Sequence, residues 1–169
     1  IRIAIRSPQE NKSMSEIKRI KVLIVDDSAF MRTAIERMLQ EDSSIEIIGS
    51  AANGKEAVSK VVRLKPDVVT MDVEMPIMDG LHALKEIMRL CPTPVLMVSS
   101  LTHEGAKVTL DALELGAVDY VPKPGSTLSV NVLRLKQDLI AKVHAVAHCK
   151  PQAVKLEFVS NRRPGRRGP

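Results

Sequence analysis

Five short segments rich in aliphatic and β-branched residues predict strands. They are residues 20–25, 45–50, 68–71, 95–98 and 118–121. The third, Val68-Val69-Thr70-Met71, lacks the polar alternation of a strand with one exposed face. Apolar runs of this kind are typical of parallel strands that are covered on both faces.

Helical patterns fill the gaps between these strands. After Ser28, a good N-cap, apolar residues recur on one side of a predicted helix at Met31, Ile35, Met38 and Leu39. The other helices are predicted from the Asn53-Gly54 turn to Lys65-Pro66, from Leu81 to about Leu90, from Glu104 to Leu115, and from Leu128 to Val146.

The alternation of strands and helices predicts an α/β fold with a doubly wound, five-stranded parallel sheet. Parallel strands need crossover connections, and these are right-handed. Five strands suit the flavodoxin-like order 2-1-3-4-5. In that order ligands bind at the switch point between the carboxyl ends of the first and third strands.

The charge of the chain is concentrated at its ends. The 169 residues have a formal net charge of +5 and 44% hydrophobic content, enough for one domain with extensions. Residues 150–169 carry six basic side chains and one acidic side chain, and residues 1–21 carry six basic and two acidic ones. Residues 22–149 are therefore left with a net charge of −4, and we expect no nucleic-acid surface on the folded part.

Three regions are expected along the chain. Residues 1–19 form an N-terminal extension, and within it residues 1–13 resemble an artificial or mis-assigned addition before a natural start at Met14. Residues 20–148 form the folded domain, and residues 149–169 form a basic linker or tail rich in Pro, Gly and Arg.

The cysteine content and the hydropathy predict a cytoplasmic location. Two cysteines are too few for a disulfide framework and suggest a reducing compartment. No apolar run approaches the roughly 20 residues of a membrane span, and the N-terminus lacks the continuous apolar region of a secretory signal.

Acidic residues end the two strands that flank the predicted switch point. Asp26-Asp27 follows the first strand and Asp72 follows the third. Carboxylates about 4 Å apart repel by about 4 kcal/mol per pair at an effective dielectric constant near 20, so the site needs a cation. Hard oxygen ligands with open positions suit Mg²⁺, and one of the carboxylates could then act as a nucleophile towards phosphorus.

The two remaining strand ends supply groups that suit phosphoryl chemistry. Ser99 brings a hydroxyl after the fourth strand, and Lys123 brings an ammonium after the fifth. A fixed ammonium can neutralise charge on the oxygens of a transferring phosphoryl group. The alternative is an acidic pocket of structural importance only, stabilised by a salt bridge to Lys123.

Together these residues resemble the motif set of the response regulator receiver domain. The matching positions are Asp26-Asp27, Asp72 with Met75-Pro76 and Asp79-Gly80 after it, Ser99, and Lys123-Pro124, within a match that covers about residues 20–148.

The resemblance implies a role for each residue. Asp72 is the implied phosphoacceptor, and Asp26, Asp27, Asp72 and the backbone carbonyl of Glu74 are the implied Mg²⁺ ligands. The same resemblance implies that Ser99 hydrogen-bonds the phosphoryl group, that Lys123 pairs with it, and that Tyr120 is a coupled rotamer switch.

A narrower resemblance links residues 69–76, 94–102 and 113–121 to the receivers of the chemotaxis protein-glutamate methylesterase (CheB) family. In that family a CheA-like histidine kinase phosphorylates the receiver. Phosphorylation relieves the receiver's block of an attached Ser-His-Asp esterase domain, which removes methyl esters from chemoreceptors. This chain contains no Gly-x-Ser-x-Gly elbow, so we expect the regulatory half without the esterase machinery.

Two other classes of protein stay open at this point. One is the receiver of a DNA-binding regulator cut before its effector, with Arg162–Arg167 as a fragment of a nucleic-acid arm. The other is a nucleotide- or flavin-binding domain, which would want a Gly- or hydroxyl-rich loop where this chain has Asp26-Asp27.

Two weaker motifs have simpler interpretations. Residues 49–56 nearly spell a phosphate-binding P-loop, but Glu56 stands where a hydroxyl is needed, so a plain turn at Asn53-Gly54 is preferred. His144, His148 and Cys149 resemble a metal-binding face, but histidines near a helix end are more often there because cations suit that end of the helix dipole.

Overall fold

The computed structural model describes residues 18–99, 103–123 and 130–151. Within them, a single sheet is formed by five parallel strands in the order β2-β1-β3-β4-β5. The strands are β1 (Ile20–Val25), β2 (Ile45–Ala51), β3 (Val68–Asp72), β4 (Val95–Ser99) and β5 (Asp119–Pro122). The predicted doubly wound sheet and its strand order are therefore confirmed.

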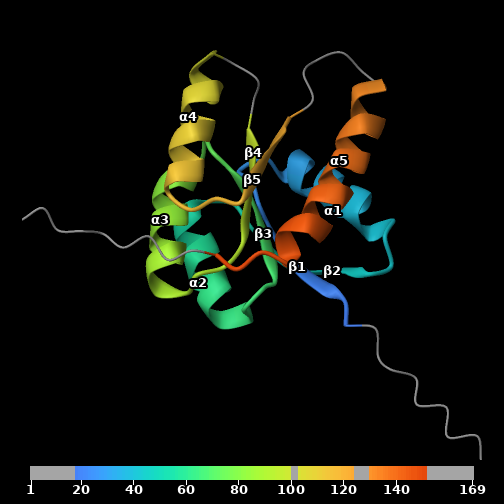
Figure 1. The fold of residues 1–169 in the computed structure, drawn as a ribbon, viewed down its shortest axis with the longest axis horizontal. Coiled ribbons are helices and arrows are strands. Elements are labelled where there is room, and N and C mark those ends of the chain that lie inside the picture. Colours follow the sequence, from blue (N-terminus) through green and yellow to red (C-terminus); the bar gives the residue numbers. More distant parts are fainter. Residues whose placement is uncertain (1–17, 100–102, 124–129, 152–169) are drawn as a thin grey trace, which may run out of the picture.

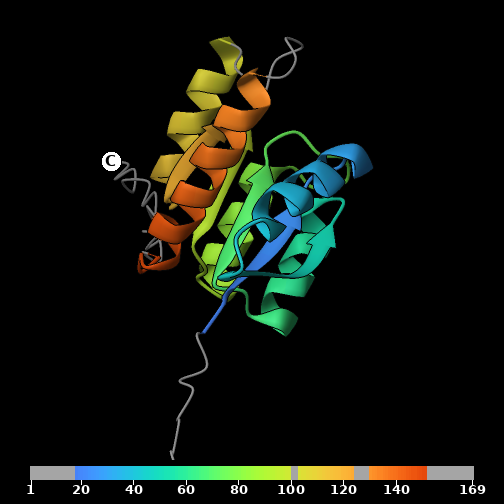
Figure 2. The same cartoon turned by 90° about the vertical axis from the view of Figure 1, so that its right-hand side faces the viewer.

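Helices cover both faces of the sheet (Figures 1 and 2). α1 (Ala29–Gln40) and α5 (Val130–Ala147) lie on one face. α2 (Gly54–Leu64), α3 (Gly80–Leu90) and α4 (His103–Glu114) lie on the other. No helix among the described residues combines the length and the hydrophobicity needed to cross a bilayer.

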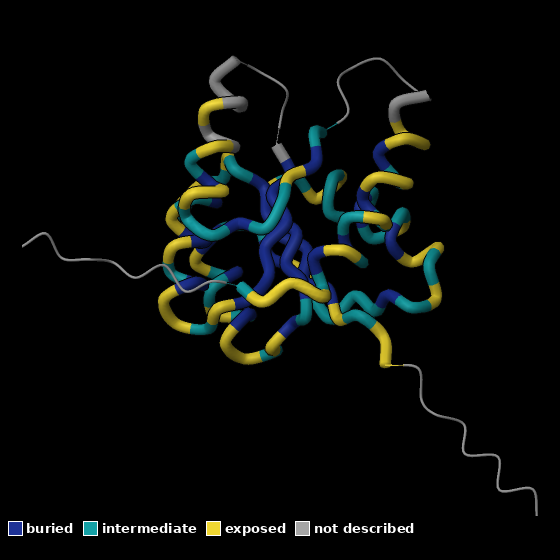
Figure 3. The backbone as a smooth tube through the Cα atoms, viewed as in Figure 1, coloured by how far each residue is buried: buried dark blue, intermediate teal, exposed yellow. Residues whose placement is uncertain are grey.

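The sheet is buried between these two helical layers, as the dark centre of Figure 3 shows. Neighbouring residues of a strand point to opposite faces. In β1, Leu23 packs with the α2 and α3 layer, whereas Val22 and Ile24 pack with the α1 and α5 layer. Because both faces of the sheet are dry, the strands need apolar residues at successive positions, which explains the near-continuous runs in the sequence.

Side chains in the loops that follow three of the strands cap the next helix. The Met31 N–H donates to Ser28 Oγ (3.3 Å), the Glu56 N–H to Asn53 Oδ1 (2.9 Å), and the His82 N–H to Asp79 Oδ1 (2.8 Å). Each contact satisfies a backbone donor that the first turn of a helix leaves free. Asn53 is thus a helix cap, in agreement with the preferred interpretation of residues 49–56 as a turn.

The observed boundaries differ little from the predicted ones. β5 begins at Asp119 rather than at Val118, and α5 begins among the described residues at Val130. The predicted start of that helix at Leu128 lies outside the described residues.

Candidate functional site

Three carboxylates converge at the carboxyl ends of β1 and β3. Asp26 and Asp27 follow β1, Asp72 ends β3, and one oxygen from each lies within 4.8 Å of the others. Asp26 and Asp72 are buried, whereas Asp27 is exposed. The cluster lies at the switch point of the strand order, where the sequence predicts it.

A single ammonium serves both buried carboxylates. Lys123, the residue after β5, places its Nζ 2.8 Å from Asp26 Oδ2 and 2.8 Å from Asp72 Oδ2. The lysine side chain is 17% exposed, so both ion pairs are largely shielded from water. Lys123 therefore ties the end of β5 to the ends of β1 and β3.

Burial and charge act in opposite directions on these groups. Burial raises the pKa of the Asp72 carboxyl, and the nearby Lys123 ammonium only partly offsets this effect. Burial alone would lower the pKa of Lys123, but the contacts with Asp26 and Asp72 outweigh it and raise that pKa. One ammonium shared by several carboxylates leaves the site short of positive charge.

The loop after β1 is fixed by hydrogen bonds that sequence reasoning missed. The Ser28 N–H donates to Asp26 Oδ1 (2.9 Å), and Arg32 Nη1 donates to the backbone carbonyls of Asp26 (2.8 Å) and Asp27 (3.2 Å). Arg32 lies one turn into α1, so only its position four residues after the Ser28 cap could have suggested this role. These bonds fix the Asp26 carboxylate and the backbone of both aspartates before any ligand arrives.

The loop after β3 requires a glycine at position 80. The Gly80 N–H donates to the Val73 carbonyl (2.8 Å), and a Cβ at this position would lie 2.1 Å from the backbone carbonyl oxygen of Asp72. This close approach packs the start of α3 against the end of β3. The Asp79-Gly80 pair thus positions the backbone of Asp72.

Glu74 lies beside the acidic cluster. It is exposed, and it lines a groove together with Asp27, Asp79 and the apolar residues Val73, Met75 and Leu81. The groove opens next to the carboxylates and leaves Asp27 and Glu74 accessible from solvent. A role for the Glu74 backbone carbonyl as a metal ligand stays a prediction.

Ser99 and Tyr120 occupy the neighbouring strand ends. Ser99 ends β4 and pairs with Pro122 in the sheet, one position beyond the pairing of Asp72 with Val98. The Ser99 side chain lies outside the described residues. Tyr120 lies on β5 at the edge of the sheet, with 38% of its surface exposed.

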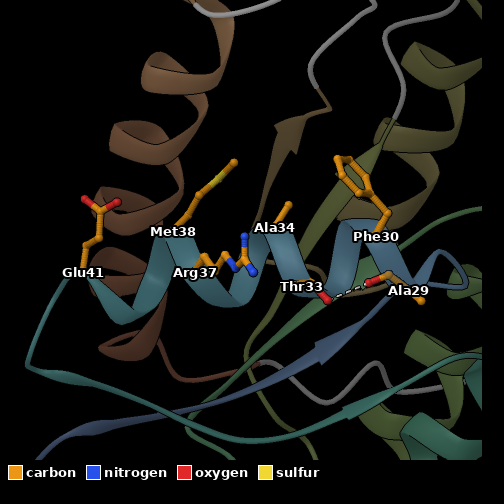
Figure 4. Close-up of a pocket in the computed structure, with 7 residues that line it drawn as sticks. All are labelled: Ala29, Phe30, Thr33, Ala34, Arg37, Met38 and Glu41. Atoms are coloured by element: carbon orange, nitrogen blue, oxygen red, sulfur yellow. Dashed lines mark hydrogen bonds between the residues drawn. The ribbon is translucent and has the colours of Figure 1, made fainter.

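A second groove runs along α1, close to the acidic loop (Figure 4). It is lined by Ala29, Phe30, Thr33, Ala34, Arg37, Met38 and Glu41. Phe30, near the start of the helix, is 79% exposed. An aromatic side chain is thus presented to solvent only a few residues beyond Asp26 and Asp27.

The donor set fits a hard divalent cation. The buried Asp26 Oδ2 has no partner with hydrogen-bond geometry among the described residues, although Lys123 Nζ lies nearby. Oxygen donors, a surplus of negative charge and an open side at Asp27 are what Mg²⁺ prefers. Within the described part of the chain, this acidic cluster is the one group of three or more potential metal ligands. His144, which the sequence offered as part of a possible metal-binding face, instead contacts Asp42 (Nε2 to Oδ2, 2.8 Å).

Comparison with known proteins identifies the family. The sequence model of the response regulator receiver domain matches residues 22–132. The chain belongs to the response regulator receiver domain family. Within this family it is 56% identical over 128 residues to a protein-glutamate methylesterase/protein-glutamine glutaminase of Pseudomonas fluorescens, covering 76% of this chain and 34% of the relative. The chain thus spans about a third of the length of this curated relative.

Solved receiver domains share the fold. The response regulator domain of Thermotoga maritima CheB aligns with a TM-score of 0.73 and 45% identity, covering 79% of this chain and 99% of that one. A chain of the CheX-CheY-BeF3-Mg+2 complex from Borrelia burgdorferi aligns with a TM-score of 0.62 and 33% identity, covering 73% of this chain and 88% of that one. The receiver described here is therefore CheB-like, as the three matching segments predict.

Proposed function

We propose that this receiver accepts a phosphoryl group on Asp72 from the phosphohistidine of a CheA-like kinase. The observation that carries the proposal is the convergence of Asp26, Asp27 and Asp72 on one another, with Lys123 shared between the two buried carboxylates. The similarity to CheB receivers supports the same conclusion and selects chemotaxis as the setting.

In this reaction a carboxylate oxygen of Asp72 forms a bond to phosphorus while the bond from phosphorus to the donor imidazole breaks. The product is an acyl phosphate and a free histidine. Lys123 stands 2.8 Å from Asp72 Oδ2, where its ammonium can pair with the negative oxygens of the transferred group. We assign the Ser99 hydroxyl to a further hydrogen bond with this group.

Asp26, Asp27, Asp72 and the Glu74 carbonyl are the proposed ligands of Mg²⁺. When bound, the ion supplies charge neutralisation at the phosphoryl oxygens. The three carboxylates repel one another without it, and Lys123 alone leaves this repulsion partly uncompensated.

The proposed consequence of phosphorylation is release of an attached methylesterase. Residues 20–148 would form the regulatory domain, residues 1–19 an extension and residues 149–169 a linker or tail. In the phosphorylated state Tyr120 would turn inward and change the surface around β5, which would uncover the esterase that acts on chemoreceptors. The two cysteines of the chain, which are too few for a disulfide framework, support a cytoplasmic location for this signalling.

The DNA-binding alternative has less support. The curated relative reported above is a methylesterase, and the folded part is mildly acidic outside its ends.

The first experiment tests the acceptor. Incubation with acetyl phosphate or a phosphorylated CheA-like kinase should label wild-type protein with a hydroxylamine-labile group, and Asp72→Asn should abolish labelling. Asp67→Asn, at the opposite end of the sheet, is the matched control and should be labelled normally. Labelling that persists in Asp72→Asn would assign the phosphoryl group to another residue.

The second experiment tests the regulation. The receiver is joined to the esterase domain of a CheB relative, and methyl ester hydrolysis is measured with and without a phosphodonor. Stimulation is expected for the wild-type receiver and not for Asp72→Asn. Equal stimulation of both proteins would refute phosphorylation-dependent release.

A further inference from the structure

One ammonium on α5 contacts Tyr120 and its strand in three ways. Lys142 Nζ donates to the Tyr120 carbonyl oxygen (2.7 Å) and to Asp119 Oδ2 (2.8 Å), and it lies 5.2 Å from the centroid of the Tyr120 ring. The other oxygen of the same carboxylate, Asp119 Oδ1, accepts the Tyr120 N–H (2.7 Å). Both backbone polar groups of Tyr120 and its ring are therefore engaged by this pair.

The two hydrogen bonds hold the ammonium beside the ring. A lysine on a helix surface normally samples many rotamers, so an isolated contact with an aromatic face is weak. Here the Asp119 carboxylate and the Tyr120 carbonyl, both on β5, hold Nζ, and the Lys142 side chain is 31% exposed. The cation–π contact therefore forms without a further loss of side-chain freedom.

We propose that Lys142 is a positioning residue that holds Tyr120 in its outward orientation and so biases the receiver towards its unphosphorylated state. The contact with the ring is made to the partly exposed side chain seen here and would be lost if the ring turned into the protein. An interaction present in one of two states shifts their equilibrium by its own free energy. At a partly exposed site a cation–π contact favours the outward state by a factor of about two to five.

Lys142 should in turn affect how readily the phosphorylated state forms, a consequence that rests on the proposed function. If phosphorylation draws Tyr120 inward, then removing the Lys142 ammonium favours the phosphorylated state by the same factor. The beryllofluoride adduct, a phosphoryl mimic on aspartate, should then form at a two- to fivefold lower concentration.

The composition of the chain makes the ring directly measurable. Tyr120 is the single tyrosine, and there is no tryptophan, so tyrosine fluorescence comes from this one side chain. Quenching by acrylamide, which is uncharged, reports the exposure of the ring without sensitivity to a charge change at position 142.

The test compares Lys142→Met with wild-type protein. Methionine keeps the aliphatic stem but removes the charge and the hydrogen bonds to Asp119 and to the Tyr120 carbonyl. We expect weaker quenching in Lys142→Met, shifted towards the value of wild-type protein saturated with beryllofluoride and Mg²⁺. Lys142→Arg, which keeps a cation over the ring, should restore the wild-type value.

A matched control lies on the same helix. Lys136 pairs with Glu41 at 2.6 Å and is 25% exposed, so Lys136→Met removes a similar ion pair that does not contact Tyr120. This variant should leave the quenching unchanged. Asp119→Asn, which loosens one anchor of the ammonium, should shift quenching in the same direction as Lys142→Met but less, and it serves if Lys142→Met unfolds.

The outcomes separate the two proposals. Quenching in folded Lys142→Met that equals or exceeds the wild-type value would overturn the role of Lys142, because the lysine would then merely cover the ring. If Lys142→Met does not fold, the same result in Asp119→Asn would overturn it. A wild-type protein that does not respond to beryllofluoride and Mg²⁺ would contradict the proposed phosphorylation instead. The comparison of unliganded variants would still decide the role of Lys142 in that case.

Discussion

At the scale of single residues, the site is governed by a shortage of positive charge. Two buried carboxylates share the Lys123 ammonium, and burial holds the pKa of Asp72 above its ordinary value. A raised pKa means that the folded protein binds the Asp72 proton more tightly than the unfolded chain does. Ionisation of Asp72 therefore costs stability as the pH rises from 3.8, the ordinary pKa of an aspartate, through the pKa of the folded state.

We predict that Asp72→Asn stabilises the protein at neutral pH. Asparagine keeps the shape and removes the buried charge, so the free energy of unfolding should rise by about 1 kcal/mol, or roughly 3 °C in Tm. Thermal unfolding across a pH series measures this gain, which should vanish as the pH falls towards 3.8 and wild-type Asp72 becomes protonated. Asp138→Asn, an exposed site on α5, should show no gain; a destabilised Asp72→Asn would contradict the charge shortage.

At the scale of elements, the start of α3 is built against the backbone of Asp72, the proposed phosphoacceptor. The contact between Gly80 and the Asp72 carbonyl leaves no room for a side chain. The start of α3 therefore fixes the position of the Asp72 backbone relative to Asp26 and Asp27. Because the obstacle is backbone, a larger residue can be accommodated only if the loop itself moves.

We predict that Gly80→Ala impairs both stability and phosphorylation. Its Cβ would displace the end of β3 or the start of α3, at a cost of about 2 kcal/mol, and should slow labelling by acetyl phosphate at least several-fold. The control is Gly49→Ala, whose Cβ meets the flexible Leu64 Cδ1 at 3.3 Å and should change stability by no more than about 0.5 kcal/mol. Chemical denaturation and labelling rates distinguish the two variants, and equal behaviour would show that the Gly80 contact is not restrictive.

The elements themselves are well encoded in local sequence. The Ser28 cap, the Asn53-Gly54 turn and the apolar strand runs predicted boundaries close to the observed ones. Long-range polar pairs are different, because nothing local to His144 indicates that it meets Asp42. There the Ser44 and His144 hydrogen bonds lower the pKa of the Asp42 carboxyl to about 2. The pairing of Lys142 with Asp119 could not be predicted from the local sequence for the same reason.

At the scale of the whole molecule, the parallel sheet explains why the acidic site could be predicted. Every strand of such a sheet ends at the same edge, so residues that end strands meet in space even when they are far apart in sequence. The strand order alone is therefore enough to predict that Asp26 and Asp72 lie close together. Arg32 was missed because it reaches the site from inside a helix.

We predict that Mg²⁺ stabilises the entire domain by binding the acidic cluster at the carboxyl ends of the strands. A ligand that binds only the folded state at ten times its Kd adds about 1.4 kcal/mol to the free energy of unfolding. Thermal unfolding with and without Mg²⁺ should show this gain in wild-type protein, a smaller gain in Asp27→Ala, and none in the double substitution of Asp26 and Asp27 by Ala. An unchanged response in the double variant would remove these residues from the metal site, and Na⁺ at matched ionic strength controls for screening.

The direction of α5 sets a requirement on any domain that follows it. This helix begins near the carboxyl ends of the strands, where Asp72 lies, and ends beside the start of β1, at the opposite end of the sheet (Figure 1). Its 18 residues rise about 27 Å, and an extended chain covers about 3.3 Å per residue. About eight residues of linker are therefore needed before the first residue of a following domain can return to the level of Asp72. With a shorter tether, that domain must begin nearer the opposite end of the sheet.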